Sequence, residues 1–314
     1  MSDPFKTAGT NGAYRRAMKT VTPDTLTAAE RYLTLNARLI DRLRFAYLFR
    51  GGSPTAVRTA LSAYANPDGG FGHALEPDLR GASSQPQPVE VALHLLDETT
   101  TGDESFDGPL VRAACDYLMR ISTADGGVPF VLPTVRDTPA APWWQTPDDP
   151  PGNLNPTAAL AGVLLKHGVD HPFVERATAF SWAGVDAITE ISSPYEAYPV
   201  LTFLDHVPDR DRATRTVNRL APMITPHVTL DPAASGEAHF PLDFAPSPDG
   251  FGRTLFDDVT IDAHLDALVD AQREDGAWTF NWPAWTPAVE YEWTGFVTVQ
   301  RLKTLGAYER FEID

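Results

Sequence analysis

The sequence contains a single cysteine in 314 residues. Cys115 cannot form an internal disulfide, and without a second thiol no cysteine-based zinc site can be built. The sequence also lacks any apolar run near the roughly 18 residues that cross a bilayer, and its first residues have no apolar core of a secretion signal. We therefore expect a soluble, cytoplasmic protein with no membrane span.

Basic side chains are few. The chain has 25 lysine and arginine residues against 42 aspartate and glutamate residues, which gives a net charge of −17. Such a charge repels nucleic acid phosphates and anionic membrane surfaces, so nucleic acid is excluded as a partner. With 43% hydrophobic and 10% aromatic residues, the composition is still that of a globular chain.

Alternating strand patterns are absent, whereas helical periodicity recurs along the chain. The first helical segment, 27–49, begins with a capping box formed by Thr27 and Glu30 and ends before two glycines. Further helical segments lie at 54–65, 87–98, 108–121, 156–167, 172–183, 195–206, 209–223, 256–272 and 287–306. The sequence therefore predicts an all-α fold, with an N-terminal extension at 1–24 and a single domain at 25–314.

Proline and glycine gather between the predicted helices. Of the 28 prolines and 22 glycines, many lie in two long stretches, 133–153 and 228–252. Ordered loops of this length inside a domain usually carry function. We therefore expect the functional site among these loops and the shorter glycine-rich turns.

A turn made of aspartate, glycine and an apolar residue recurs after predicted helices. It reads YANPDGGFG from Tyr64, ISTADGGVPF from Ile121, APSPDGFG from Ala245 and QREDGAWTF from Gln272. The spacings are close to multiples of about 50 residues, which suggests a degenerate helical-hairpin repeat. Glycine supplies the left-handed backbone past a helix end, and the aspartate side chain bonds local amides. The recurring aspartate is therefore interpreted as a turn residue rather than a catalytic acid.

Gln272, Gly276 and Trp278 in QREDGAW resemble the Gln-Trp motif of squalene-hopene and related terpenoid cyclases, which protein prenyltransferases share in weaker form. The resemblance extends over about 61–305. It implies an α/α toroid, in which inner and outer helices form two concentric rings of five or six hairpins around a central cavity. It also implies that the motif ties successive helices together.

The catalytic motifs of that superfamily are not matched. Class II terpenoid cyclases carry a D-x-D-D-T-A segment whose middle aspartate protonates the substrate. The stretch most similar in form is NLNPTAAL, where Asn153, Asn155 and Pro156 stand in place of acids. Protein prenyltransferases hold zinc with Asp, Cys and His, but the corresponding segment AVEYEWTGFVTVQRL has no histidine. We expect no metal and no cofactor, and a different carboxylic acid as proton donor.

Three glutamates are candidates for this acid. Glu290 and Glu292 lie in the tryptophan-rich stretch PAWTPAVEYEWTGF at a predicted helix start, where desolvation and like charge would raise a carboxyl pKa. Helix capping is the alternative for this pair. Glu76, with Asp78 and His73 beside it, follows the first glycine turn as the other pair follows the last, so both sets would meet at one mouth of a ring. A solvated acidic loop is the alternative there.

Arginines and tryptophans of the same loops are candidates for substrate binding. Arg80, Arg136 and Arg253 each follow a glycine turn and would hold a diphosphate or carboxylate if the turns share a rim. Surface ion pairs with nearby aspartates are the alternative. Aromatic loop residues would line a hydrocarbon cavity, stabilise a carbocation or stack on sugars, with plain packing as the alternative; they include Trp143, Trp144, Trp282, Trp285 and Trp293.

Two further pairs are interpreted without catalysis. Asp257 and Asp258 are adjacent at a predicted helix start, where they are expected to cap the helix. His167 and His171 have a metal-like spacing, but Gly168 breaks the helix that would place both on one face.

These features favour an isoprenoid-processing enzyme that resembles a stand-alone terpenoid cyclase domain, an isomerase or lyase acting on a small hydrophobic substrate. Two other functions stay open. A carbohydrate-active toroid, hydrolase or lyase, would use two carboxyl groups ~5.5 Å or ~6.5–9.5 Å apart. A non-catalytic toroid would bind a ligand or a partner, because fold alone does not fix function.

Overall fold

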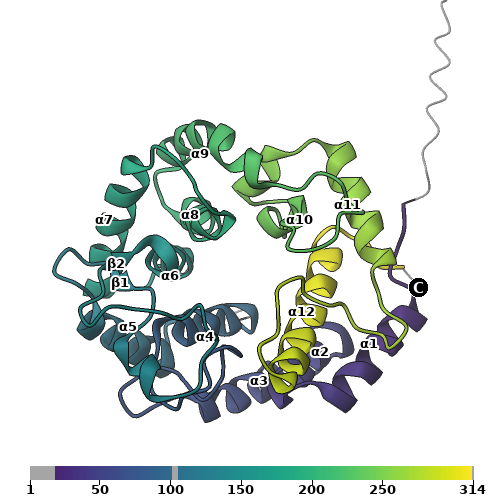
Figure 1. The fold of residues 1–314 in the computed structure, drawn as a ribbon, viewed down its shortest axis with the longest axis horizontal. Helices are drawn as coiled ribbons and strands as arrows, with labels where there is room; N and C mark the ends of the chain where they lie inside the picture. The colour runs from purple at the N-terminus through teal and green to yellow at the C-terminus, as the bar shows by residue number, and fades with distance from the viewer. Residues whose placement is uncertain (1–17, 101–104, 313–314) are drawn as a thin grey trace, which may run out of the picture.

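The computed structural model describes residues 18–100 and 105–312, which form a ring of helices (Figure 1). Inner and outer helices alternate along the chain. The outer helices are α1 (Pro23–Asn36), α3 (Pro54–Leu61), α5 (Pro109–Ile121), α7 (Pro172–Ala187), α9 (Arg210–Ile224) and α11 (Asp258–Asp270). The inner helices are α2 (Leu39–Arg50), α4 (Pro86–Glu98), α6 (Leu154–Lys166), α8 (Pro194–His206), α10 (Pro241–Phe244) and α12 (Pro287–Ala307). This arrangement confirms the predicted all-α fold and the α/α toroid.

Short elements lie in the connections between the helices. They are η1 (Ser62–Tyr64), β1 (Val128–Pro129), η2 (Pro133–Asp137), β2 (Gly152–Asn153), η3 (Thr225–His227) and η4 (Phe251–Leu255). The two strands pair antiparallel. No helix within the described residues combines the length and hydropathy needed to cross a bilayer. The expected N-terminal extension, 1–24, lies mostly outside the described residues.

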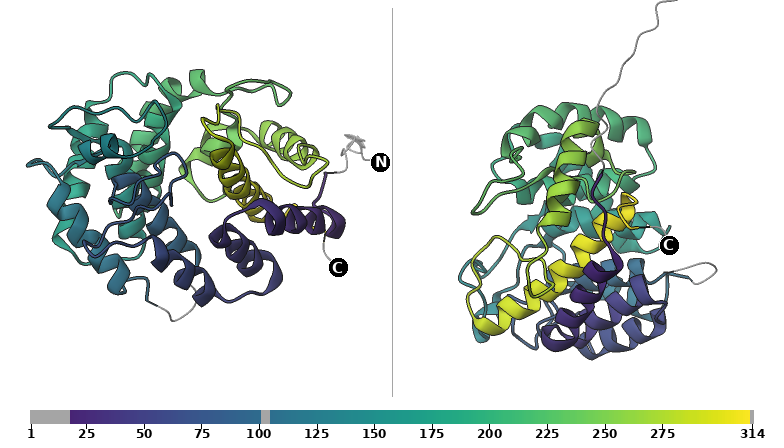
Figure 2. Two further views of the ribbon diagram at one scale, coloured as in Figure 1. Left: turned by 60° about the horizontal axis from the view of Figure 1, so that its bottom comes forward. Right: turned by 90° about the vertical axis from the view of Figure 1, so that its right-hand side faces the viewer.

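The four longest connections all lead from an outer helix to the next inner helix. They span 62–85, 122–153, 225–240 and 271–286. Because each hairpin runs out along one helix and back along the next, these connections gather at one end of the ring. Figure 2 shows that α12 lies beside α1 and α2, so the last hairpin packs against the first.

The single helix predicted over 27–49 is wrong. The chain forms two helices, α1 and α2, which are separated by extended backbone at Ala37 and Arg38. Thr22, not Thr27, caps the first helix by accepting a hydrogen bond from the amide of Thr25. Leu35 and Leu39 are consequently 70% and 55% exposed. The break carries no glycine or proline, and Arg38 makes tertiary hydrogen bonds there that propensity does not encode.

Three of the four glycine turns join neighbouring hairpins. In each, a glycine with positive φ lies against a backbone carbonyl of another outer helix: Gly69 against Ala113 of α5, Gly126 against Arg176 of α7, and Gly276 against Ala28 of α1. The last contact connects the end of the ring to its beginning. The fourth turn differs, because Gly250 has φ −80° and leads into η4 ahead of the outer helix α11.

The motif residues around Gly276 act as a structural clasp. Gln272 donates from Nε2 to the carbonyl oxygens of Thr25 at 2.8 Å and Gly276 at 2.9 Å. The indole nitrogen of the buried Trp278 donates to the carbonyl of Leu268 at 2.7 Å. The bond to Thr25 fastens the segment after α11 to α1, and the bond from Trp278 fastens the same segment to α11. The bonded groups all belong to the fold itself, so these residues have a structural role.

Candidate functional site

Two buried carboxyl groups lie in the connection between α3 and α4, in a segment of residues 72–80 that we call the acid loop. Glu76 is 6% exposed and Asp78 is 3% exposed. The indole nitrogen of Trp285, in the connection before α12, donates to Asp78 Oδ1 at 3.0 Å. The side chains of Asp41 and Glu98 are buried as well, but each is paired with an arginine, whereas Glu76 has a buried carboxyl oxygen without a hydrogen-bond partner. This difference makes the acid loop the candidate site.

The backbone of the acid loop is strained. His73 and Ala74 have φ values of 56° and 60°, a region that residues with a Cβ rarely occupy. Strained backbone persists where surrounding contacts over-determine it, and it concentrates at functional sites. The His73 side chain is exposed and its Nε2 lies 3.0 Å from Asn66 Oδ1, so it is directed along the loop surface.

Glu76 is held as a neutral acid. Burial, and next the charge of Asp78, raise the pKa of Glu76 to about 8, against the opposing effect of the Asp78 and Leu79 amides and of Arg38. Its Oε2 atom is buried and has no hydrogen-bond partner. A carboxyl group protonated at neutral pH is an O–H donor, so Glu76 has the protonation state that general acid chemistry requires.

Asp78 has a more polar environment than Glu76. Burial raises the pKa of Asp78 to about 6, while the indole N–H groups of Trp293 and Trp285 and the charge of Arg80 lower it. Trp285 makes a regular hydrogen bond, whereas the buried Trp293 Nε1 approaches the carboxylate without completing one. The neighbouring acids Glu76 and Asp78 therefore differ in pKa, as acid and partner carboxylate do in many active sites.

Of the two glutamates on α12, only Glu292 reaches the acid loop. Glu292 forms an ion pair with Arg80, and both side chains are mostly buried. Glu290 is exposed and instead lines an open cleft of about 730 Å³ between α1 and the start of α12, together with Arg31 and Arg273. Residues two apart on a helix face different directions, so Glu290 and Glu292 do not pair.

Aromatic side chains extend from the acid loop along α12. Ring centroids lie 4.7 Å apart for Phe280 and Trp282, 5.1 Å for Trp282 and Trp293, and 5.6 Å for Trp293 and Phe296. The guanidinium of Arg44 on α2 lies 5.0 Å from the centre of the Phe296 ring. These rings border the site on one side, where the indole N–H of Trp293 approaches Asp78.

A second aromatic group packs under the acid loop. Trp144 is buried, stacks on Phe130 at 4.9 Å and belongs to a small apolar cluster with Leu79, against which Trp285 packs. Trp143 is 43% exposed and lies outside this cluster. Four of the five predicted tryptophans therefore form two groups, Trp144 with Trp285 and Trp282 with Trp293.

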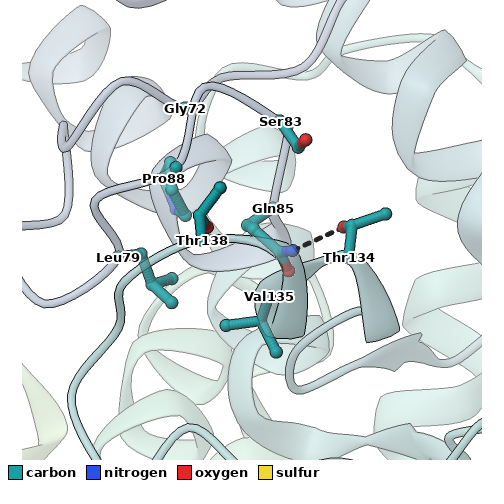
Figure 3. Close-up of a pocket in the computed structure, with 9 residues that line it drawn as sticks. Gly72, Leu79, Ser83, Gln85, Pro88, Thr134, Val135 and Thr138 are labelled. Carbon is teal, nitrogen blue, oxygen red and sulfur yellow. Dashed lines mark hydrogen bonds between the residues drawn. The ribbon is translucent and has the colours of Figure 1, made fainter.

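The acid loop also packs against the connection between α5 and α6, where the carbonyl of Asp78 accepts from the amide of Ala141 at 3.0 Å. Gln85, which follows the acid loop, donates to Thr134 Oγ1 at 2.8 Å (Figure 3). Its Oε1 accepts from the amide of Leu132 at 2.8 Å. A cavity of about 10 Å³ lies between these segments, lined by Leu79 and Val135 among others. It has room for a single water molecule and not for a substrate.

The other residues singled out by sequence lie elsewhere. Arg136 forms an ion pair with Asp148, and Arg253 forms one with Asp258. Asp257 caps α11 by accepting from the amide of Thr260. Only Arg80 of the three arginines contacts Glu292 beside the acid pair.

The two histidines with metal-like spacing have separate partners. His167 contacts Asp97 and His171 contacts Asp116. Within the described ranges, no group of three or more His, Cys, Asp and Glu residues is arranged to hold a metal ion.

Two interacting groups were not singled out from the sequence. Arg38, at the break between α1 and α2, bonds the acid loop. Arg44 forms a buried bidentate pair with Glu98 of α4, which also accepts from Lys303 of α12. No periodicity or motif marks either group, because each joins segments far apart in the chain.

Comparison with known proteins supports the fold. No protein-family model matches the sequence, and no curated protein matches it. The structure is similar to that of the type II terpene cyclase MstE from Scytonema, solved as an aspartate-to-alanine variant in complex with merosterolic acid A as product. The match has a TM-score of 0.50 and 12% sequence identity, and it covers 90% of this chain and 86% of that chain. At this identity the likeness concerns the fold.

Proposed function

We propose that the protein is a terpenoid cyclase-like enzyme in which Glu76 protonates an isoprenoid substrate. The observation that supports this most is the Glu76 carboxyl, buried with an unpartnered Oε2 and with a pKa raised to about 8. A type II terpene cyclase shares the fold over most of both chains. The D-x-D-D acids of that class are missing, and Glu76 supplies an acid from a different connection of the ring.

The reaction assigned to Glu76 is an isomerisation. The carboxyl proton adds to an electron-rich carbon or oxygen of the substrate, leaving a cation on the substrate and a carboxylate on Glu76. Loss of a proton from the cyclised cation restores the balance of atoms and charge. We assign the stabilisation of the cation between these steps to the indole rings of Trp293, which lies beside Asp78, and of the neighbouring Trp282.

Asp78 and the ion pair beside it have supporting roles in this proposal. The charge of Asp78 raises the pKa of Glu76, so it helps keep the proton on the acid until substrate arrives. Arg80 is held by Glu292 at the border of the acid pair. Since Glu76 is only 6% exposed, substrate entry requires the acid loop to move. The contacts that would then part include this ion pair and the hydrogen bond from Trp285 to Asp78.

Product analysis tests the proposal. Purified protein is first screened by thermal shift against linear isoprenyl diphosphates, squalene-type hydrocarbons and oligosaccharides, because a ligand at ~100 times its Kd stabilises the fold by ~2.7 kcal/mol. Each isoprenoid that binds is then incubated with enzyme, and the products are identified by gas chromatography and mass spectrometry. A cyclic product is expected from at least one of them.

Two matched glutamine variants locate the acid. Glu76→Gln keeps the size of the side chain but has no proton to give, so it should lower product formation by at least ~10²-fold. Glu290→Gln, on the exposed cleft, should leave the rate unchanged. Equal loss in both variants, or full activity of Glu76→Gln, would exclude Glu76 as the donor. Stabilisation by oligosaccharides alone would exclude the isoprenoid class.

A further inference from the structure

Arg38 ties the acid loop to the inner ring. Its Nη1 donates to the carbonyl oxygens of Ala74 at 3.0 Å and Leu75 at 2.9 Å. Its Nε donates to Asp41 Oδ2 at 2.8 Å, and Asp41 is fully buried on α2. The planar guanidinium is therefore fixed by a carboxylate on one side and holds two backbone carbonyls on the other.

The two carbonyls belong to the strained part of the loop. Ala74 follows His73, and both have positive φ, which costs free energy in residues with a Cβ. Glu76 comes directly after Leu75, whose carbonyl Arg38 also binds. If these bonds were lost, the turn would relax towards an ordinary conformation and carry Glu76 with it.

We propose that Arg38 is a positioning residue that holds the strained turn at His73 and Ala74 closed and thereby keeps the Glu76 carboxyl in its dry site. This inference rests on the proposed role of Glu76 as the acid. Its test measures the protonation of Glu76 and not turnover, so that the two proposals fail separately.

The charge of Arg38 and its hold on the loop should shift the pKa of Glu76 in opposite directions. The positive charge of Arg38 by itself lowers the pKa of Glu76, while burial and Asp78 raise it. Two further charged groups lie beside Asp78: Arg80 lowers the pKa of Asp78, and Glu292 raises it. Removing Arg38 would therefore raise the pKa of Glu76 if only charge mattered, and would lower it if the residue mainly keeps the loop closed.

The experiment is a carbon-13 NMR titration of the full chain with labelled glutamate carboxyl groups. The Glu76 signal is identified by its loss in Glu76→Gln, and its titration midpoint in the unaltered protein is expected at about 8. Arg38→Lys keeps the charge but has one nitrogen in place of the planar fork, so it cannot occupy both the Nε position that binds Asp41 and the Nη1 position that binds the two carbonyls. Its midpoint should fall towards the ordinary 4.5, and that of Arg38→Met should fall as well.

Either of two results would overturn the positioning role. An unchanged midpoint in Arg38→Lys, or a raised midpoint in Arg38→Met, would show that Arg38 acts by charge alone. Arg38→Lys decides the matter if the methionine variant does not fold. Arg50→Lys, at the far end of α2 and paired with Glu30, is the control and should leave the midpoint unchanged. If the Glu76 midpoint falls in the Arg38 variants but the unaltered protein forms no cyclic product, the positioning role is supported and the cyclase proposal is refuted.

Discussion

Gly276 lies directly against the carbonyl oxygen of Ala28, and this contact joins the last hairpin of the ring to the first. A Cβ built on Gly276, whose φ is +96°, would lie 2.2 Å from that oxygen. A second contact closes the same seam, because the amide of Val21 donates to the carbonyl of Arg310 at 2.7 Å. The ring is therefore completed by backbone packing that no bulkier residue at position 276 allows.

Gly276→Ala should open this seam. The new methyl would meet Ala28 and would also sit on a left-handed backbone, so we expect the free energy of unfolding to fall by more than about 2 kcal/mol. Gly51→Ala is the control, since Gly51 has φ +65° but a Cβ added there would meet no atom within 4 Å. It should cost only ~1 kcal/mol. Urea denaturation followed by circular dichroism measures both, and equal losses would show that the contact with Ala28 adds nothing.

Stability should depend on pH through Glu76. Its pKa is raised to about 8 in the folded protein from an ordinary 4.5. The stabilisation from the bound proton is thus complete below 4.5 and is lost as pH rises to about 8, with a slope approaching ~1.4 kcal/mol per pH unit. Asp78 adds a similar effect over the lower part of this range, because its pKa is raised to about 6.

Unfolding by urea at several pH values, compared with Glu76→Gln, isolates this effect. The glutamine variant should be less dependent on pH above 6 and more stable than the unaltered protein at pH 8. A parallel pH dependence in the two proteins would mean that Glu76 is already ionised in the folded state.

The buried pair of Arg44 and Glu98 gives the opposite pH dependence. Although burial raises the pKa of Glu98, the charge and hydrogen bonds of Arg44, with Lys303, lower it to about 2 from an ordinary 4.5. This stabilisation is present above pH 4.5 and is lost as pH falls towards 2. Glu98→Gln removes the bidentate carboxylate and leaves the buried Arg44 charge with Asp41 at 3.6 Å, so it should cost about 3 kcal/mol at neutral pH.

An exposed ion pair supplies the comparison for Glu98. Asp148 is 94% exposed in its pair with Arg136, so Arg136→Ala should change the unfolding transition little. If Glu98→Gln were as mild as Arg136→Ala, the buried pair would not stabilise the inner ring.

Much of the fold could be predicted from the sequence because its determinants are local. Helical periodicity and the glycine turns mark the hairpins, and the turn around Gly276 forms the clasp that its resemblance implied. The break at Ala37 and Arg38 could not be predicted, since helix-forming residues run through it and the cause is a set of bonds to the acid loop. The short inner helix α10 was not predicted, because it lies in a stretch that is rich in proline and glycine and was interpreted as a loop.

The candidate site was predictable in its residue types and less so in its geometry. The sequence pointed to Glu76 and Asp78 because they follow a glycine turn. The divergence of Glu290 and Glu292 follows from helical rotation of about 200° over two residues, which local sequence does imply. The partners of Arg80 and Arg44 come from segments far along the chain, and one sequence contains no signal for such pairings.

Thr298 on α12 should prove as important to the clasp as the glycine. Its buried hydroxyl accepts from the amide of Trp278 at 3.0 Å and faces the carbonyl of the same residue at 3.3 Å. Thr157 on α6 does the same for Val128, which follows the glycine turn at Gly126: its hydroxyl accepts from the amide of Val128 and donates to the carbonyl of Val128. A threonine on an inner helix thus fixes the chain after two of the turns.

Thr298→Val keeps the shape but leaves two buried backbone groups of Trp278 without partners, so we expect a loss of about 1–3 kcal/mol in the free energy of unfolding. Thr298→Ser keeps the hydroxyl and removes one methyl, which should cost about 1 kcal/mol. Urea denaturation of both variants and of Thr157→Val gives the comparison. If Thr298→Ser lost more free energy of unfolding than Thr298→Val, Thr298 would act by packing. Thr298→Val and Thr157→Val should lose similar amounts, because each threonine holds the chain through the same pair of hydrogen bonds.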